Sequence, residues 1–541
     1  MKHRNFILFI VLTFFLSPEF YSENINTLKF ALVYPELTKE VLYKNDRSFK
    51  PTDDWEIFFM SKHLKYEMLN DNSIDEIKDD IDVVIFPSTE AVTEDLIEGI
   101  EDLLNRGKGI LITGNFAVFD EDGNRINTDL QYRILDFKIT LLPDINEISI
   151  NHTLIGNTPF SIDLMPGTKI LLKQKPGLYF ASGSSDICSN EGYYFPINKN
   201  FADTISGIIS ENKFSGRLLW LGCNFDQLIG ENRDKFLMNS FNWLSPKPVA
   251  FINDLPGDYL SAAIIYRQIE KQNDINSGKT LADSNKISYF VSPPVFENSG
   301  SKIKDLNDVG TLNILWDNFF FSKLSPEKEE RWLIQTKYLI KEITGQDYIG
   351  IASYGELYDS SDYRYLKDAG YSFTFYSGYS NSFFIDNDSV RNIYSFINQS
   401  IPGKDYHSGL NFILNNDGIL YINADSLKTN ENYFKDLVGE HLWITTFSDL
   451  LKWITKMGQL KISCYFVDNE YKISIWNNAS DDIHNLGVWI SAPDITSSLY
   501  IKNTYSDGKM TFVPDKKMYN LKINLIPGKG NVSFTIAGIT R

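Results

Sequence analysis

The sequence predicts a multi-domain α/β protein with two segments of alternating strands and helices, followed by a C-terminal β-sandwich. Its 541 residues exceed what one hydrophobic core holds, so about three domains are expected. Short apolar runs alternate with amphipathic helices over residues 27–245 and again over 249–457, which is typical of parallel sheets. Residues 459–541 instead show short alternating runs separated by turn signals, which is typical of a sandwich.

Composition narrows the possible partners. Hydrophobic residues make up 43% and charged residues 23% of the chain, as in ordinary globular proteins. The formal net charge of −18 produces a field that repels phosphate backbones. Nucleic acid is therefore not expected as a partner.

The N-terminus has the pattern of a secretory signal. Lys2 and Arg4 precede the apolar run Phe6–Leu16, which is shorter than the ~20 residues that a membrane-spanning helix needs. We expect residues 1–22 to be a signal peptide, with an uncleaved anchor as the alternative. The mature chain is then exported to the periplasm or the cell exterior and has no membrane span.

The three cysteines, Cys188, Cys223 and Cys464, lie far apart and show no metal-binding spacing. A disulfide framework is not predicted. A single Cys188–Cys223 bridge and three buried free thiols both remain open at this point.

The first segment, residues 27–245, contains a strand–helix–strand unit. Asp82–Phe86 is a buried apolar strand, and Thr93 then caps a helix whose apolar residues recur at helical spacing. Gly109–Gly114 is the next buried strand. Because the connections are short, the two strands are expected to be parallel.

The segment ends with the strand Arg217–Gly222 and the helix Lys235–Leu244, before the proline-containing linker Ser245–Pro248. The runs DVVIFP, GILITGNF and GRLLWLGCNF resemble the class I glutamine amidotransferase-like fold, a flavodoxin-like architecture. In active members a nucleophilic cysteine sits on the turn after a strand. Asn115 occupies that turn here, and an amide is no nucleophile, so amidotransferase activity is not expected.

The second segment repeats strand and helix at a size that fits a (β/α) barrel. Its expected first elements are a strand at Val249–Ile252, a helix over 259–271 and a strand at Lys286–Val291. A long helix begins at Pro326, a favoured first helical position, and ends at Gly345. The later expected elements are strands at 348–351, 371–375 and 418–422, and helices near 361–369 and 448–456.

Most of residues 249–455 resemble the NodB-type polysaccharide deacetylase family. The family's first motif, T-F-D-D-G-P, corresponds to Phe251–Pro256. The resemblance implies that Asn253 replaces the general base and that Asp254 is the surviving metal ligand.

The other three motifs are also incomplete. Val309–Trp316 contains neither of the family's two metal-binding histidines, and Ile351–Gly355 keeps Tyr354 but not the arginine of R-P-P-Y-G. Asn423 stands where the family has a catalytic histidine. Deacetylation needs a metal, a base and an acid, and one carboxylate does not hold a catalytic zinc. The resemblance therefore implies a pseudoenzyme with no metal and no cofactor.

The mouth of the predicted barrel is the expected place for a glycan. The candidate substrate-binding residues are Tyr354, Tyr358, Tyr363, Asp317 and Glu356. Core packing explains most aromatic residues equally well, and carboxylates at strand ends often cap helices.

Seven strands of an immunoglobulin-like sandwich are expected after Gly458, at roughly ten-residue intervals. They are Leu460–Phe466, Tyr471–Trp476, Leu486–Ile490, Leu499–Ile501, Met510–Val513, Leu521–Leu525 and Val532–Ile536. Trp476 and Trp489 are candidate sugar platforms on this unit, and a purely structural appendage is the alternative that stays open.

The function that these patterns favour is non-catalytic binding or scaffolding of polysaccharide in the cell envelope or outside the cell. Two alternatives stay open. One is an active carbohydrate hydrolase that uses carboxylates at the barrel mouth, and the other is a structural envelope component.

Overall fold

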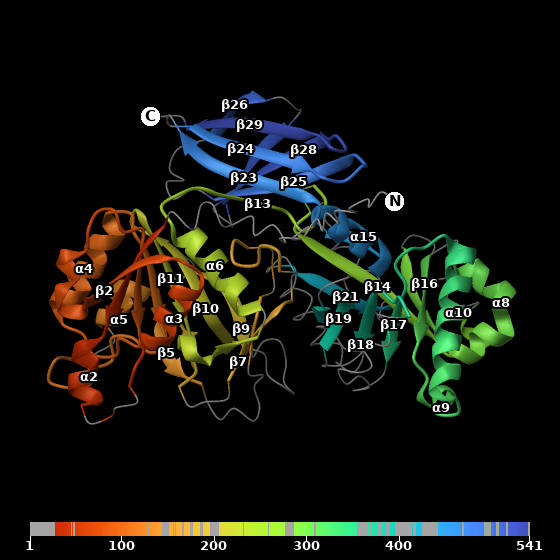
Figure 1. Cartoon of the computed structure of the whole chain (residues 1–541), viewed down its shortest axis with the longest axis horizontal. Helices are drawn as coiled ribbons and strands as arrows, with labels where there is room; N and C mark the ends of the chain where they lie inside the picture. Colours follow the sequence, from red (N-terminus) through yellow and green to blue (C-terminus); the bar gives the residue numbers. More distant parts are fainter. Residues whose placement is uncertain are drawn as a thin grey trace, which may run out of the picture.

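The computed structural model is built from three units, two α/β units and one all-β unit, which Figure 1 shows above both of the others. It describes residues 28–44, 46, 49–126, 129–142, 151–154, 156, 158–164, 167–173, 177–183, 188–194, 205–230, 232–257, 259–275, 286–307, 310–353, 366, 369–376, 381–385, 390–394, 414, 418–424, 442–467, 470–491, 499–504, 508–514 and 518–538. The predicted signal peptide, residues 1–22, lies outside these ranges. Within them, no helix combines the length and the apolar character needed to span a bilayer.

The first unit is one mixed sheet. Five neighbouring strands are parallel, in the order β2 (Lys65–Asn70), β1 (Lys29–Tyr34), β3 (Val83–Pro87), β4 (Gly109–Thr113) and β11 (Gly216–Leu221). The sheet continues through antiparallel strands, namely β10 (Ile205–Lys213), β9 (Ser189–Tyr194), β6 (Asn151–Thr153), β7 (Lys169–Leu172) and β12 (Leu228–Ile229). Two further strands, β5 (Lys138–Leu141) and β8 (Tyr179–Ser182), join beside β10.

Helices cover both faces of this sheet. The helices α4 (Glu94–Asn105) and α5 (Asp129–Leu135) pack on one face, and α3 (Asp53–Ser61) and α6 (Asn232–Leu244) pack on the other. The predicted strand–helix–strand unit is confirmed, because β3 and β4 are parallel neighbours joined through α4.

The start of α4 offers a test of the capping argument. The Leu96 amide donates to Thr93 Oγ1 at 3.1 Å, whereas Ser325, which precedes α10 (Pro326–Thr344), makes no such side-chain bond. We expect Thr93→Ala to lower the free energy of unfolding by about 1 kcal/mol, since one helix-terminal N–H loses its partner. Ser325→Ala, the matched control, is expected to change it by less than about 0.5 kcal/mol. Urea unfolding of both variants measures this, and equal losses would contradict the role given to Thr93.

The second unit is a curled parallel sheet, a half-barrel. Its parallel strands run in the order β18 (Phe373–Tyr376), β17 (Gly350–Ser353), β16 (Gly310–Leu315), β15 (Ile287–Val291), β14 (Ser261–Ile269) and β21 (Ile419–Asn423), with β22 (Leu442–Thr445) also parallel to β14. The hairpin β19 (Asn381–Ile385) and β20 (Val390–Tyr394) extends one end. The helices of this unit are α8 (Pro293–Asn307), α9 (Asn318–Phe321), α10 and α15 (Phe447–Met457). The described strands form an open sheet, with no pairing that closes a barrel.

Two predictions for this unit are wrong. The helix expected over 259–271 is the strand β14. Its sequence, SAAIIYRQI, is buried along nearly its whole length in a parallel sheet, where apolar runs show no alternation that would mark a strand. The strand β13 (Val249–Ile252), expected to open the barrel, instead pairs antiparallel with β25 (Ile483–Ser491) of the third unit.

The third unit consists of two four-stranded antiparallel sheets that share one core. One sheet has the order β13, β25, β28 (Met518–Ile526), β27 (Gly508–Val513). The other has the order β23 (Leu460–Val467), β24 (Glu470–Asn477), β29 (Asn531–Gly538), β26 (Leu499–Thr504). All seven predicted strands are confirmed, and β13 is an eighth that comes from far earlier in the chain.

The outer face of the β13–β25 sheet packs against the first unit. Val249, Phe251, Trp489 and Met518 form a small apolar cluster with Ile162. The alternation along β13 explains this, because Ala250 points instead into the sandwich core. The third unit is therefore bound to the first by buried apolar contacts as well as by the chain.

Candidate functional site

The carboxyl edge of the first sheet holds a polar cluster without a reactive thiol. Asn115 follows β4 after Gly114, which has a φ of +70°, and its Nδ2 donates to Glu90 Oε2 at 3.0 Å. The Tyr43 hydroxyl donates to the other oxygen of the same carboxylate at 2.9 Å. The side chain of Asn115 is therefore fixed by a hydrogen bond to the Glu90 carboxylate, which suits a structural role. An amide supplies no nucleophile.

Cys223 gives this unit no alternative nucleophile. None of the three cysteines forms a disulfide, so the open question of a Cys188–Cys223 bridge is answered. Cys223 follows β11 and is fully buried, and burial raises the pKa of its thiol well above the usual range. A thiol that stays protonated is unreactive.

Asn253 and Asp254 do not lie where the deacetylase resemblance places them. They follow β13, which belongs to the sandwich, so the prediction that they end the first barrel strand is wrong. Asn253 is buried, and its Nδ2 donates to the carbonyls of Gly257 at 3.2 Å and Tyr259 at 3.1 Å. The Leu255 amide donates to its Oδ1 at 3.3 Å. Asn253 therefore holds the turn through which the chain passes from the sandwich to the half-barrel.

The strand that pairs with β15 at the centre of the half-barrel is β14. Its carboxyl end carries Arg267 and Gln268, followed by Glu270, in place of two adjacent aspartates. Asn423 is the last residue of β21 and lies beside Tyr266 of β14 in the register, nearly buried. Only Asn423, of the three degenerate positions, lies at this sheet edge.

Asp317, which follows β16, serves as a helix cap. Its Oδ1 accepts from the Phe320 amide at 3.1 Å at the start of α9, and Trp316 stacks on Phe321 with ring centroids 4.1 Å apart. The other four candidate substrate-binding residues, Tyr354, Glu356, Tyr358 and Tyr363, lie outside the described residues. In the described part of the chain, no group of three or more His, Cys, Asp or Glu side chains is placed to hold a metal ion.

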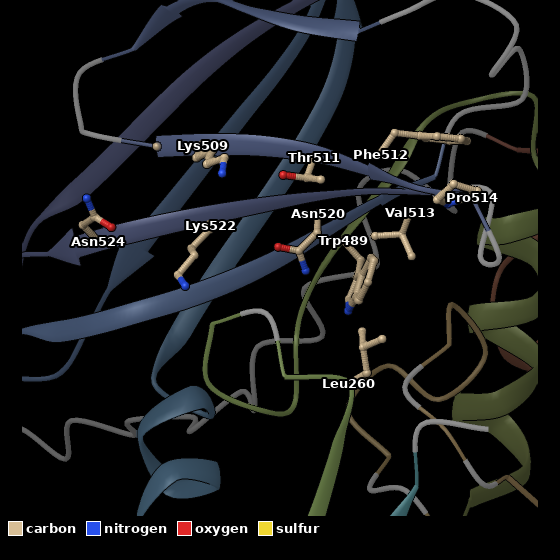
Figure 2. Close-up of a pocket in the computed structure, with 11 residues that line it drawn as sticks. Leu260, Trp489, Lys509, Thr511, Phe512, Val513, Pro514, Asn520, Lys522 and Asn524 are labelled. Carbon is tan, nitrogen blue, oxygen red and sulfur yellow. The ribbon is translucent and has the colours of Figure 1, made fainter. Parts of the chain in front are cut away.

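A pocket of about 650 Å³ lies instead where the sandwich meets the entry to the half-barrel, and we call it the junction pocket (Figure 2). Its volume falls in the range of roughly 300–1,000 Å³ that is typical of small-molecule sites. It is lined by Leu260, Trp489, Gly508, Lys509, Thr511, Phe512, Val513, Pro514, Asn520, Lys522 and Asn524. All but Leu260 come from the sandwich, and Leu260 immediately precedes β14.

The strand register brings the polar side chains together. Asn520 of β28 lies directly opposite Trp489 on one side and Thr511 on the other, and Lys522 lies opposite Lys509. Residues two apart along a strand share a face, so these side chains line one face of the sheet, as Figure 2 shows.

Asn520 is the most informative residue of this face. Its side chain is 6% exposed, and its Nδ2 has no hydrogen-bond partner among the described residues. A buried donor left in that state costs about 1–3 kcal/mol, so such groups call for an explanation. A ligand with acceptor oxygens would offer such a partner.

The two tryptophans predicted as sugar platforms, Trp476 and Trp489, do not offer an exposed ring face in the pocket. Trp489 is 1% exposed, so its ring forms a wall and offers no free face for stacking; the prediction of an exposed platform is wrong for this residue. Trp476 is 39% exposed but lies on β24 of the other sheet and does not line the pocket. Phe512 lines the pocket and is the partly exposed aromatic residue of its rim.

In comparisons with known proteins, parts of this chain are distantly similar to solved structures. No protein-family model matches the sequence, and neither does any curated protein. Among solved structures, the chain is similar to a β-galactosidase from Bacillus circulans sp. alkalophilus, with 9% identity over 43% of this chain and 36% of that chain and a TM-score of 0.32. It is also similar to a ThuA-like protein from Bacteroides uniformis, with 14% identity over 40% of this chain and 91% of that chain and a TM-score of 0.29.

A family 4 carbohydrate esterase from Bacillus anthracis is a third similar structure. The identity is 14% over 37% of this chain and 86% of that chain, and the TM-score is 0.25. The chain spans about a third of the length of the galactosidases that it matches. The similarity to carbohydrate-active enzymes is therefore distant.

Proposed function

We propose that the chain is a glycan-binding protein that holds its ligand in the junction pocket and does not turn it over. The observation that carries this proposal is the nearly buried Asn520 amide, which lines the pocket and whose Nδ2 has no partner in the described part of the chain. Export to the periplasm or the cell exterior, predicted from residues 1–22, belongs to the same proposal.

The chemistry of the lining supports a carbohydrate. Asn520 and Asn524 offer amide donors and acceptors, and Thr511 offers a hydroxyl, which together suit the dense hydroxyl groups of a sugar. Leu260 and Val513 add apolar surface for the C–H faces of sugar rings. A few placed polar groups on an otherwise apolar wall are typical of binding sites with defined orientation.

The same lining argues against catalysis in this pocket. Among the described residues, its lining includes no Asp, Glu, His or Cys. Glycoside hydrolysis ordinarily uses a pair of carboxylates, and metal-dependent deacetylation needs ligands for the metal and a base. The described lining of the pocket offers neither set.

Asn520→Leu tests the proposal. Leucine has about the same size as asparagine but neither a hydrogen-bond donor nor an acceptor. We expect the Kd for the bound glycan to rise about tenfold, because a tenfold change corresponds to about 1.4 kcal/mol, the contribution of one good hydrogen bond. The free energy of unfolding is expected to stay the same or to increase, because a buried donor without a partner is removed. A merely structural asparagine would instead lose stability.

The measurement is calorimetric titration of the full chain with a panel of soluble polysaccharides, alongside assays for released sugar and acetate. Asn478→Leu is the matched control, since Asn478 is exposed in the turn after β24 and does not line the pocket. Binding of none of the polysaccharides would contradict the proposal. Turnover that Asn520→Leu leaves unchanged would favour an active hydrolase with its site elsewhere.

A further inference from the structure

We infer that the junction pocket selects glycans whose sugars carry a methyl group, as 6-deoxyhexoses and O-methylated sugars do. The inference rests on the proposed function and names the class of glycan. It is carried by the described lining of the pocket, which has an apolar side and a polar side with Asn520 between them (Figure 2).

The apolar side of the pocket is formed by Leu260, Trp489, Phe512, Val513 and Pro514. Leu260 and Val513 pack against the small apolar cluster around Trp489 and are only partly buried by it. Because both also line the pocket, part of their apolar surface faces the cavity. A sugar hydroxyl placed there loses its hydrogen bonds to water and gains none from these side chains, whereas a methyl group gains favourable contact.

The polar side of the pocket carries Lys509, Lys522 and Asn524, which Figure 2 shows on the opposite side of Asn520 from the apolar residues. The strand register gives the same order. Val513 and Lys509 lie on either side of Thr511 along β27, and Thr511 is opposite Asn520. Polar side chains of these types suit the hydroxyl groups of a sugar ring. A ligand that fills both sides of the pocket therefore has hydroxyl groups at one end and an apolar group at the other.

Asn520 determines which atom of the ligand lies beside the apolar group. Its Nδ2 is a buried donor without a partner among the described residues, so it needs an acceptor. A hydroxyl oxygen accepts but brings a hydrogen that needs a partner too, whereas an ether oxygen brings none. In a methyl ether the methyl group is bonded to such an oxygen, and in a 6-deoxyhexose it is bonded to the carbon beside the ring oxygen. Either sugar thus offers an acceptor to Asn520 and a methyl group to Leu260 and Val513.

The test is titration of the full chain with matched pairs of ligands, by ligand-observed NMR for the sugars and by calorimetry for the polymers. The pairs are L-fucose with L-galactose, L-rhamnose with L-mannose, and methylcellulose with hydroxyethylcellulose. In each pair the second member ends in a hydroxyl group where the first ends in a methyl group. We expect the first member of at least one pair to bind about tenfold more tightly, as is typical of one methyl group in an apolar pocket. A difference in a sugar pair identifies a 6-deoxyhexose, and a difference in the polymer pair identifies a methyl ether.

Two variants change the apolar side of the pocket. Val513→Thr replaces one methyl group by a hydroxyl group at similar size, and Leu260→Ala removes apolar surface that comes from the half-barrel. Each is expected to reduce the preference within the pair to below about threefold, while binding of the member without the methyl group changes little. Val118→Thr, the same substitution at a partly buried position that does not line the pocket, is the matched control and is expected to keep the full preference. Thermal melting of all three variants establishes that they remain folded.

The outcomes separate the two proposals. Equal binding within every pair, or binding only of polysaccharides without methyl groups, would overturn the methyl-bearing class and leave glycan binding intact. A preference that Val513→Thr and Leu260→Ala both leave unchanged would also overturn it, since the methyl group would then lie elsewhere. Binding of no sugar and no polysaccharide at all would remove the proposed function itself.

Discussion

Replacement of Arg217 by methionine is expected to lower the free energy of unfolding by about 2–5 kcal/mol, since each buried acceptor left without a donor costs about 1–3 kcal/mol. Arg217 is 1% exposed at the start of β11. Its guanidinium donates to the backbone carbonyl of Trp243 and, at 3.2 Å, to that of Ser245, both at the carboxyl end of α6. Methionine fills similar space but leaves these buried carbonyls without a donor.

The same guanidinium joins two units of the protein. Its second nitrogen donates to Ser491 Oγ at 3.2 Å, at the end of β25 in the sandwich. Loss of Arg217 is therefore expected to loosen the contact between the first unit and the sandwich in addition to the first unit itself. Arg217→Lys keeps the charge but loses the planar fork of donors, and we expect it to recover only part of the stability.

Urea unfolding followed by tryptophan fluorescence measures the loss, and hydrogen exchange of peptides from β11 and β25 locates it. Arg331→Met, on the exposed face of α10, is the matched control with an expected change below about 0.5 kcal/mol. A loss of the same small size for Arg217→Met would show that the buried guanidinium does not hold the two units together.

A second large effect is expected from pH. Glu211 on β10 is 4% exposed, and burial raises the pKa of its carboxyl to about 8, with a further contribution from its hydrogen bond to Asp136. In the unfolded chain the same group titrates near its ordinary value of 4.5. The folded protein therefore holds a proton that the unfolded chain releases between these two pH values.

The sign of the effect follows from this difference. The stabilisation by Glu211 is fully present below its unfolded pKa and is lost as the pH rises through its folded pKa. We expect the wild type to lose about 2–4 kcal/mol more stability than Glu211→Gln between pH 5 and pH 8, since each pKa unit corresponds to about 1.4 kcal/mol.

Hydrogen exchange of β10 peptides at the two pH values measures this loss for the unit that contains Glu211. Glu98→Gln, an exposed position on α4, is the control and is expected to follow the wild type. If Glu211→Gln loses as much stability as the wild type over this interval, the carboxyl is already ionised in the folded protein at pH 5.

The sequence predicted those helices and strands that have a regular spacing of apolar residues and a recognisable boundary residue. The strand at Asp82–Phe86, the capped helix after Thr93 and the seven sandwich strands each have a period and a boundary residue in the sequence. Pairing of distant strands has no such signal. Val249–Ile252 has the composition of a strand in either sheet, and the sequence contains nothing that favours β25 over a barrel neighbour.

The junction pocket was missed for the same reason. Lys509, Asn520 and Lys522 look like the ordinary polar positions of alternating strands, because their meeting depends on the register of β27 with β28. The register with β25 and the arrival of Leu260 from the half-barrel complete the site. The sequence places Lys509 just before the predicted strand Met510–Val513 and Lys522 within the next one, Leu521–Leu525, but it does not fix the register that sets them opposite each other.

More than 200 residues separate β13 from its partner β25 in the sequence, so the sheet that contains both strands is completed late in synthesis. Residues 249–252 leave the ribosome well before β25, β28 and β27, which supply their sheet and nearly all of the pocket lining. Contacts so distant in sequence form late and slowly, and β13 exposes an unpaired edge until they do. A chain that stops before β25 therefore has an incomplete sheet and no junction pocket, so the proposed site forms only after residue 524 has been synthesised.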